Sequence, residues 1–563
     1  MMEKRLLLAV VLSMAVIFVF QFMQPKKTGD IVEPQPQSVP AEEQKVTAVS
    51  DKTLTRAGEY LSGEKEKTAL LDSEDLQLTL STFGASIKAA YIKNYLSDPL
   101  NSDDKTPVNL IIPEKGSDCP LAVTFNFDAS YNDEAYGAWK ILKQDREEVI
   151  FQKLFKGGIV LTKKYSLNKE NASVLDVEIA LKNEGIKDVD IDGLTVLWPK
   201  NLGSTGDGKA EKLVRIKKGG VARIDSKLFT KDTGKDAKQG LVNFAGIQDR
   251  YFIAIIIPES TSSGYISRQL EDGQSEVGVI YTGGMLQSNE KRLYKMKLYM
   301  GAKEYNALKK LGVGAEELVF SGWTFFFRAD LWFPWMCNIL LLLLNFFNKF
   351  FHNYGISIIM VTVLTKVITY PAMRAQFKSM RKMQDLAPKI QAIKAKYKDN
   401  PQKLNQETME LYKKHKVNPM GGCLPMLAQM PIFIAFYIVI YRAVELRGAS
   451  FINLHMALPA SMGSGALWIT DLSMKDPTYI LPVLMGATMF LQQKLSGTSM
   501  DPSQAKAMMI MPLVFTFIFL SFPSGLVLYW LVSNLLSIIQ QIYHNVEEGK
   551  TWSGKQKAVE KTA

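Results

Sequence analysis

A lysine inside an apolar segment is the first candidate for a functional residue in this 563-residue chain. Lys366 lies within Gly355–Met373, a run of roughly membrane-spanning length. Thr362, Lys366 and Thr369 are spaced i, i+4 and i+7, so a helix places all three on one face. A lysine at mid-bilayer costs about 2.5–3.5 kcal/mol on insertion scales, so it needs water, a partner or a route to the interface. Two interpretations follow: a functional charge, or a side chain that extends to the membrane surface near Arg374.

Polar side chains recur in the later apolar segments. Gln429 lies between two prolines, and Thr488 shares a helix face with Gln492. One stripe on the last apolar segment has the spacing i, +3, +4, +7 and +11: Trp530, Ser533, Asn534, Ser537 and Gln541. Each residue alone is more often a helix–helix hydrogen bond than a site. Together with Lys366 they predict a hydrated cavity shared by several helices, because a buried charge and several amides need solvation.

The composition argues against an enzyme. The three cysteines (Cys119, Cys337 and Cys423) are far apart and match no metal or disulfide pattern. All four histidines follow residue 350, which argues against histidine-based catalysis in the first half of the chain. We see no phosphate loop and no nucleophile elbow there. We therefore expect no catalysis, no cofactor and no metal, and the net charge of +11 indicates cytoplasmic loops rather than specific nucleic-acid binding.

The chain begins with a short basic segment and an apolar run. Residues 1–23 carry Lys4 and Arg5 before that run, and no small-x-small cleavage site follows it. This favours an uncleaved signal-anchor transmembrane helix, with a cleaved signal as the alternative. Residues 24–67 are rich in Pro, Gln, Glu and Lys, which predicts a flexible linker.

A different periodicity covers residues 68–320. Apolar and polar residues alternate repeatedly, as at Leu175, Val177, Ile179 and Leu181, and turn signals separate the runs. This pattern predicts a large, mostly antiparallel β-sandwich. Its residues indicate a binding or scaffolding domain.

The basic segment 374–416 determines the expected topology. It holds twelve Lys or Arg against four Asp or Glu, which is typical of a cytoplasmic segment. To keep it inside, the preceding apolar stretch must not span, so residues 321–354 are predicted to form an interfacial amphipathic helix. A heptad-like seam runs through the basic segment: Met383, Leu386, Ile390, Ile393 and Tyr397. With a break at Asp399-Asn400-Pro401, it predicts a cytoplasmic helical hairpin.

Six transmembrane helices are expected, with both termini in the cytoplasm. After the signal anchor they cover residues 355–373, 420–442, 477–493, 506–522 and 524–545, and a basic tail occupies 546–563. The apolar parts of the fourth and fifth, Tyr479–Leu491 and Ala507–Phe522, are short for a hydrocarbon core of about 30 Å. Short spans thin the bilayer around them.

Four stretches carry a family resemblance. YPAMRAQFKSMRKMQDLAPKIQ, KVNPMGGCLPMLAQMPIF, DPTYILPVLMGATMF and FPSGLVLYWLVSNLLSIIQQ resemble the YidC, Oxa and Alb family of membrane protein insertases. The β domain after a signal anchor is similar to the bacterial form with a large periplasmic domain, a supersandwich similar to sugar mutarotases. The resemblance implies a multi-pass inner-membrane protein with a five-helix core. It also implies a hydrophilic groove that is open to cytoplasm and lipid and closed to the outside. The family's central positive residue is usually arginine, and Lys366 keeps the charge but loses the bidentate fork.

The resemblance also implies function and partners. It implies insertion and folding of nascent membrane proteins, alone or with the Sec translocon, and contacts with the ribosome, the signal recognition pathway and the bilayer. The expected groove residues are Lys366, Thr362, Thr369, Gln429, Trp530, Ser533 and Asn534. The expected slide for an exiting apolar helix is Met430, Pro431 and Ile434. Two alternatives remain: an assembly chaperone without independent insertase activity, and a secondary transporter, although we see no inverted repeat or paired broken helices.

Overall fold

The computed structural model divides into a β unit and a helical unit, and each is described by itself. The structure describes residues 65–99, 105–111, 120–125, 135–198, 202, 219–224, 227–229, 238–239, 241–269, 275–320, 329–397, 400–415, 424–451, 469–495 and 502–547. The expected signal anchor 1–23, the linker up to residue 64 and the tail from residue 548 lie outside these residues.

The β unit is built from eighteen strands among the residues that the structure describes. They are β1 (Thr68–Asp72), β2 (Leu76–Ser81), β3 (Ser86–Leu96), β4 (Pro107–Asn109), β5 (Ala122–Phe125), β6 (Lys140–Gln144), β7 (Glu148–Leu154), β8 (Ile159–Leu167), β9 (Val174–Asn183), β10 (Val189–Trp198), β11 (Gly219–Ile224), β12 (Lys227–Phe229), β13 (Lys238–Gln239), β14 (Val242–Gln248), β15 (Phe252–Pro258), β16 (Ser262–Gln269), β17 (Ser275–Leu286) and β18 (Lys291–Ala302). Short helices η2 (Lys156–Gly158), α4 (Tyr305–Lys310) and η3 (Ala315–Leu318) accompany them.

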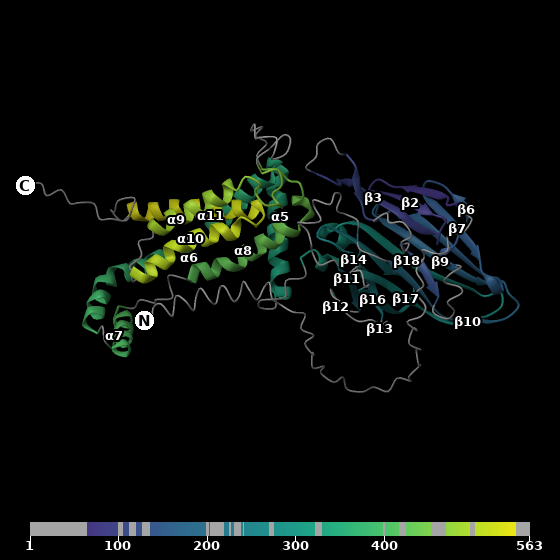
Figure 1. The fold of residues 1–563 in the computed structure, drawn as a ribbon, viewed down its shortest axis with the longest axis horizontal. Helices are drawn as coiled ribbons and strands as arrows, with labels where there is room; N and C mark the ends of the chain where they lie inside the picture. Colours follow the sequence, from purple (N-terminus) through teal and green to yellow (C-terminus); the bar gives the residue numbers. More distant parts are fainter. Residues whose placement is uncertain are drawn as a thin grey trace, which may run out of the picture. The chain divides into compact units, whose positions relative to one another are not determined.

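The strands form three antiparallel sheets (Figure 1). Their orders are β1-β2-β3-β4, β13-β16-β17-β10-β5 and β12-β11-β14-β15-β18-β9-β8-β7-β6. The two larger sheets pack against each other through β14 and β17. A single hydrophobic core takes residues from all three sheets, so the prediction of a β-rich antiparallel domain is confirmed.

The alternating sequence pattern explains the core. In β9, Leu175, Val177, Ile179 and Leu181 are buried, while the intervening residues are only partly buried. Successive side chains of a strand point to opposite faces, so a period of two places every second residue between the sheets. The pattern therefore specifies the strand and its buried face.

A buried lysine holds an irregular part of this unit together. Lys163 of β8 is fully buried, and its Nζ donates to the backbone oxygens of Gly84 (2.7 Å), Leu121 (2.9 Å) and Ala85 (3.4 Å). The ammonium also lies 5.2 Å from the ring centroid of Trp139. Ala85 and Leu121 have positive φ angles of 44° and 63°, a conformation that most side chains avoid. Lys163 thus supplies the donors for carbonyl groups that no regular strand pairing would satisfy.

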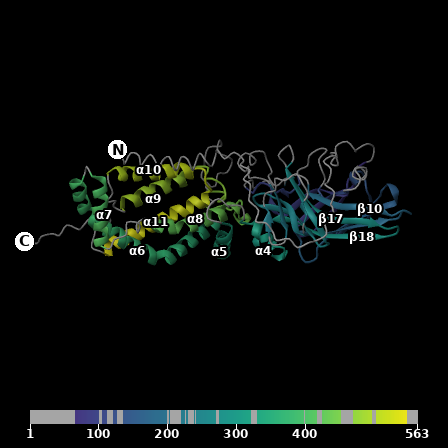
Figure 2. The ribbon, with the colours of Figure 1, turned by 90° about the horizontal axis from the view of Figure 1, so that it is seen from below.

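The helical unit contains seven α-helices among the described residues. They are α5 (Ala329–Phe351), α6 (Tyr354–Lys396), α7 (Pro401–Lys414), α8 (Leu424–Arg442), α9 (Ile480–Leu495), α10 (Pro502–Phe519) and α11 (Ser524–Glu547), and the short η5 (Val444–Leu446) follows α8. Helix α6 covers both the expected second span and the first part of the basic segment without a break. In Figures 1 and 2, α6, α8, α9, α10 and α11 run alongside one another, and Figure 1 shows α5 running across their direction.

Helix length and apolarity agree with a membrane protein. Within the described residues, three stretches are long and apolar enough to span a bilayer: Pro334–Phe351, Tyr354–Pro371 and Ser524–Val546. Gln429–Arg442 and Met509–Phe519 are shorter apolar helices. Helix α9 has 16 residues, about 24 Å at 1.5 Å per residue, which is shorter than the hydrocarbon core. Helix α5 qualifies as a span by length and composition, so these two properties do not distinguish a spanning position from the expected interfacial one.

Local chemistry defines the ends and contacts of these helices. The side chain of Asn353 caps α6 by accepting a hydrogen bond from the Ile356 N–H at 3.0 Å. Asn400 caps α7 in the same way, one residue before Pro401. Gly486 lets α9 approach α10 closely, because a Cβ at this position would collide with the Thr516 hydroxyl.

The Lys163 site predicts a large loss of β-unit stability on substitution. Lys163→Met leaves the oxygens of Gly84 and Leu121 without this donor, which costs about 2–5 kcal/mol for two buried carbonyl groups. We expect the melting temperature of the β unit in the full chain to fall by about 5–15 °C, measured by circular dichroism.

The neighbouring lysine is a matched control. Lys164 forms a 2.6 Å ion pair with Glu148 at the surface, and this contact holds the pKa of Glu148 below its usual range. A partly exposed ion pair of this kind contributes about 1 kcal/mol, so Lys164→Met should lower the melting temperature much less than Lys163→Met. Equal effects of the two substitutions would contradict the role assigned to Lys163.

Candidate functional site

Lys366 is buried in the helical unit, where it bonds to a neighbouring helix. The residue on α6 is 7% exposed, and its Nζ donates to Ser537 Oγ of α11 at 2.8 Å. Ser537 Oγ donates in turn to the backbone oxygen of Ser533 at 2.9 Å. In the part of the chain that the structure describes, Ser537 is the only hydrogen-bond partner of the ammonium. An ammonium has three N–H donors, so two remain available to a further partner.

The same face of α11 also contacts α8. Gln429 Nε2 donates to Ser533 Oγ at 3.0 Å and to the Tyr529 hydroxyl at 3.4 Å. Tyr529, Ser533 and Ser537 are four residues apart, so they form one row along the helix. We call these three residues the polar row of α11. It links Gln429 of α8 to Lys366 of α6.

A third helix joins through Asn534. Its Nδ2 donates to Thr488 Oγ1 of α9 at 3.4 Å, and Asn534 itself is buried. Helix α11 therefore provides polar groups to α6, α8 and α9. The tertiary structure brings together Lys366, Gln429, Ser533 and Asn534, which the sequence analysis selected from separate segments.

Three of the other selected residues have different surroundings. The hydroxyl of Thr362 donates to the backbone oxygen of Ile358, and that of Thr369 to the backbone oxygen of Thr365. Both hydroxyls are therefore satisfied within their own helix. The ring of Trp530 packs against the aromatic rings of its neighbours on α8 and α10: Phe433 (4.8 Å), Phe519 (5.2 Å) and Phe515 (6.2 Å between centroids).

The expected slide residues lie at the surface of α8. Met430 is 40% exposed, Pro431 is exposed and Ile434 is partly buried. Helix α10 also has exposed apolar side chains, including Leu513 and Phe517. Exposed apolar side chains on two helices of this kind suit contact with lipid or with another apolar helix.

Hydrogen bonds join the loops at one end of the bundle. The N–H groups of Ser524 and Gly525, at the start of α11, donate to the oxygens of Met474 (2.6 Å) and Leu472 (2.9 Å). The buried carboxylate of Asp476 accepts from the Leu481 N–H at 2.8 Å. We call Ile469–Tyr479 together with Pro523–Gly525 the capped end.

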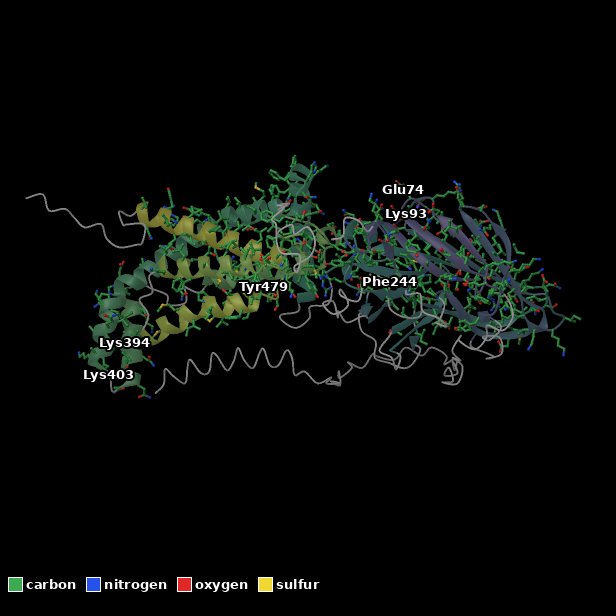
Figure 3. The ribbon with its side chains drawn as sticks, turned by 45° about the horizontal axis from the view of Figure 1, so that its top comes forward. Glu74, Lys93, Phe244, Lys394, Lys403 and Tyr479 are labelled. Carbon is green, nitrogen blue, oxygen red and sulfur yellow. The ribbon has the colours of Figure 1, made fainter. Side chains whose placement is uncertain are left out.

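The capped end is also where three helices begin. Asn353, at the start of α6, donates to the Phe451 oxygen, and the Phe451 N–H donates to the Ile469 oxygen of the capped end. Helices α6, α9 and α11 therefore run in the same direction from it. In Figure 3, Tyr479 of the capped end lies well away from Lys394 and Lys403 of α6 and α7, which lie at the other end of the helical unit. The bonded loops of the capped end and the basic residues of α6 and α7 therefore lie at opposite ends of the helical unit.

The described residues contain no group of three His, Cys, Asp or Glu side chains able to hold a metal. The side chains gathered around α11 are one ammonium and several amides and hydroxyls, which offer hydrogen bonds and charge.

Sequence relatives cover almost the entire chain. The family model for the YidC periplasmic domain matches residues 69–333, and that for the 60Kd inner membrane protein matches 346–550. Curated relatives named membrane protein insertase YidC are 33% identical in Geotalea daltonii and 34% in Syntrophus aciditrophicus, each covering 97% of this chain and 99% of the relative. The relative in Geobacter sulfurreducens is 35% identical over 97% of this chain and 98% of its own.

The chain belongs to the YidC family. A solved structure titled as an active YidC insertase matches 86% of this chain and 93% of its own, with 20% identity and a TM-score of 0.34. At that score the structural likeness adds nothing to the assignment, which depends on the sequence relatives.

Two features of this YidC-family chain were not singled out from the sequence. Tyr529 stacks on Phe436 with ring centroids 4.2 Å apart and accepts a hydrogen bond from Gln429. Tyr529 is four residues before Ser533, so the sequence already indicated that it lies on the same helix face. Asp476 with Thr478 just before α9 has the form of a helix cap, which sequence alone can indicate.

The capped end predicts a local effect of substitution. Asp476→Ala removes the acceptor of the Thr478 and Leu481 N–H groups, so both amides should exchange hydrogen faster, by about tenfold or more. Hydrogen–deuterium exchange of the full chain in detergent measures this change. Thr478 and Leu481 bond to different oxygens of Asp476, so Asp476→Asn, which keeps one acceptor oxygen, should speed exchange at only one of the two amides. Slow exchange in both variants would contradict the capping role.

Proposed function

We propose that this protein is a membrane protein insertase that inserts and helps fold inner-membrane proteins. Its full-length relationship to curated insertases, at 33–35% identity, is the observation that carries the proposal. The helical unit supports it with apolar helices of spanning length and a buried lysine bonded between two of them.

The proposed mechanism involves no covalent step. Lys366 and the polar row of α11 form a hydrophilic path between α6, α8 and α9, and this path hydrates when a substrate enters. A polar segment that moves along it avoids the full penalty for entering hydrocarbon. Lys366 attracts acidic residues of that segment, because an opposite charge stabilises the ammonium away from bulk water.

The substrate's apolar helix leaves sideways into lipid along the exposed side chains of α8 and α10. Met430, Pro431 and Ile434 are the proposed slide, and they lie on the helix that also carries Gln429. Each Leu, Ile or Phe that enters the bilayer contributes about −0.3 to −0.6 kcal/mol, so a complete span offsets a modest polar tail. The short α9 reduces the remaining distance by thinning the bilayer.

The topology is proposed from charge. The basic segment of α6 and α7 forms a cytoplasmic hairpin that receives nascent chains, the ribosome or targeting factors, and the Sec translocon is a further partner. Both termini are then cytoplasmic, six helices span the membrane, and the β unit and the capped end are periplasmic. The position of α5 across the other helices supports its interfacial placement (Figure 1).

The charge of Lys366 predicts a substrate-dependent defect. In liposomes with purified protein, Lys366→Ala should slow insertion of a short protein with an acidic tail about tenfold, the value of one charge-assisted contact of roughly 1.5 kcal/mol. Lys366→Arg keeps the charge and should insert at nearly the wild-type rate. Protease protection of the tail measures insertion.

An exposed lysine at the end of α9 provides the control. Lys494→Ala removes the same charge outside the site and should behave like the wild type. Wild-type rates for all Lys366 variants would refute the charge mechanism. A wild-type protein unable to insert any tested substrate would refute the proposed function itself.

A further inference from the structure

Two side-chain contacts join helices α6 and α11 beyond the capped end. Lys366 Nζ donates to Ser537 Oγ at 2.8 Å, and one helical turn further along α6 the ring of Tyr370 stacks on His544. The ring centroids are 6.0 Å apart and the planes 7° apart. We call the strip between these two contacts the α6–α11 seam.

Two glutamines of α11 lie between these contacts. Gln540 and Gln541 follow Ser537 by three and four residues and precede His544 by four and three. Residues at these spacings lie on one side of a helix, so both side chains lie beside the α6–α11 contact. Gln540 also follows Ser533 by seven residues and Gln541 follows Asn534 by seven, so they continue the polar side of α11 that meets α8 and α9.

Both glutamines have unused hydrogen-bonding capacity. The Oε1 atoms of Gln540 and Gln541 are buried, and neither has a hydrogen-bond donor among the described residues. The Gln541 amide is oriented by its Nε2, which donates to Asn545 Oδ1 at 3.2 Å. The hydroxyl of Thr369 on α6 donates to the Thr365 backbone oxygen at 2.8 Å, so its proton is already used.

The unsatisfied groups of the seam are complementary to one kind of ligand. A buried acceptor without a donor is unfavourable, and here two such acceptors lie within about one turn of an ammonium with two unused N–H groups. The segments 366–370 and 537–544 contain no acidic residue, so these acceptors do not select a cation. A ligand must supply neutral donors and at least one acceptor.

We infer that the α6–α11 seam binds the extended backbone of a substrate's polar segment, whatever its side chains. Backbone N–H groups donate to Gln540 and Gln541, and a backbone oxygen accepts from Lys366. Gln540 and Gln541 lie about 4.5–6 Å beyond Ser537 along the helix, and alternate residues of an extended chain are about 6.6 Å apart. One edge of such a chain therefore presents its oxygen and N–H groups at a matching spacing.

This inference rests on the proposed function and adds a role that charge alone does not explain. The charge of Lys366 favours the binding of acidic tails, whereas recognition of the backbone allows tails of any sequence to bind. Substrates differ in side chains but share the peptide group, so a neutral amide site suits a protein with many clients.

The first test removes the donors from the substrate. Two synthetic proteins share one apolar span and carry a neutral Ser/Asn tail, either ordinary or with N-methylated backbone amides. N-methylation makes the tail less polar, so hydration alone predicts faster insertion of the methylated protein by wild-type protein in liposomes. Backbone binding predicts insertion about five- to tenfold slower.

The second test removes the acceptors from the protein. The double variant Gln540→Leu/Gln541→Leu should insert the protein with the ordinary tail more slowly, by a similar factor. The factor should be the same for neutral and acidic tails. N-methylation of the tail should not slow insertion by this variant any further. If the two changes are not additive, the glutamine side chains and the backbone amides of the tail contact each other. Faster insertion of the methylated protein by the wild type, or full additivity of the two changes, would overturn the inference. Failure of wild-type protein with both ordinary tails would instead overturn the proposed function.

A cross-linking measurement is independent of the folding of the leucine variant. Gln541→Cys should form disulfides with single cysteines at several positions of a tail arrested during insertion, in both neutral and acidic tails. Ile539→Cys is the matched control, because Ile539 is 61% exposed on the same helix. Equal cross-linking at the two positions, or cross-linking to acidic tails only, would contradict backbone binding.

Discussion

A charged side chain inside an apolar helix bundle must be satisfied by its neighbours, and the arrangement around α11 follows from that constraint. The ammonium of Lys366 is bonded to Ser537, and the polar row continues through Ser533 to Gln429. Because hydrocarbon offers no hydrogen bonds, these polar groups must face one another rather than lipid. The rotation of α6, α8 and α9 about α11 is thereby restricted, while exposed apolar side chains occupy the outer surface of the bundle.

Two of the buried lysines in the described residues, Lys163 and Lys366, illustrate different uses of the same side chain. Lys163 has backbone oxygens as partners for its N–H groups and an aromatic ring beside it, so its capacity is used within the β unit. Among the residues that the structure describes, Lys366 uses one of its N–H donors, and the acceptor oxygens of Gln540 and Gln541 have no donor. A saturated lysine stabilises a fold, whereas an unsaturated one beside unsatisfied amides is suited to a ligand that comes and goes.

The two ends of the bundle also differ in how far their hydrogen-bonding groups are satisfied. At the capped end, the backbone groups that start α9 and α11 are bonded to Asp476, Met474 and Leu472, so little capacity is left for a ligand. Toward the other end of α11, the seam still has hydrogen-bonding groups without a partner among the described residues. This difference fits the proposed entry of a polar chain from the end whose hydrogen-bonding groups are unsatisfied. This asymmetry suits insertion into a membrane better than conduction across it.

The sequence by itself determined the division into a β unit and apolar helices. A period of two follows from the geometry of a strand, and a long apolar run is typical of a helix that spans a membrane. It also identified Lys366, Gln429, Ser533 and Asn534, since a polar residue in an apolar helix requires an explanation wherever it lies. Only the tertiary structure decided the partners. Trp530 lies on the same stripe as Ser533, yet its ring packs among phenylalanines, and the Thr369 hydroxyl is bonded to its own helix. Periodicity specifies the face of a helix, whereas the neighbour that meets this face depends on packing between segments more than a hundred residues apart, such as Lys366 and Ser537.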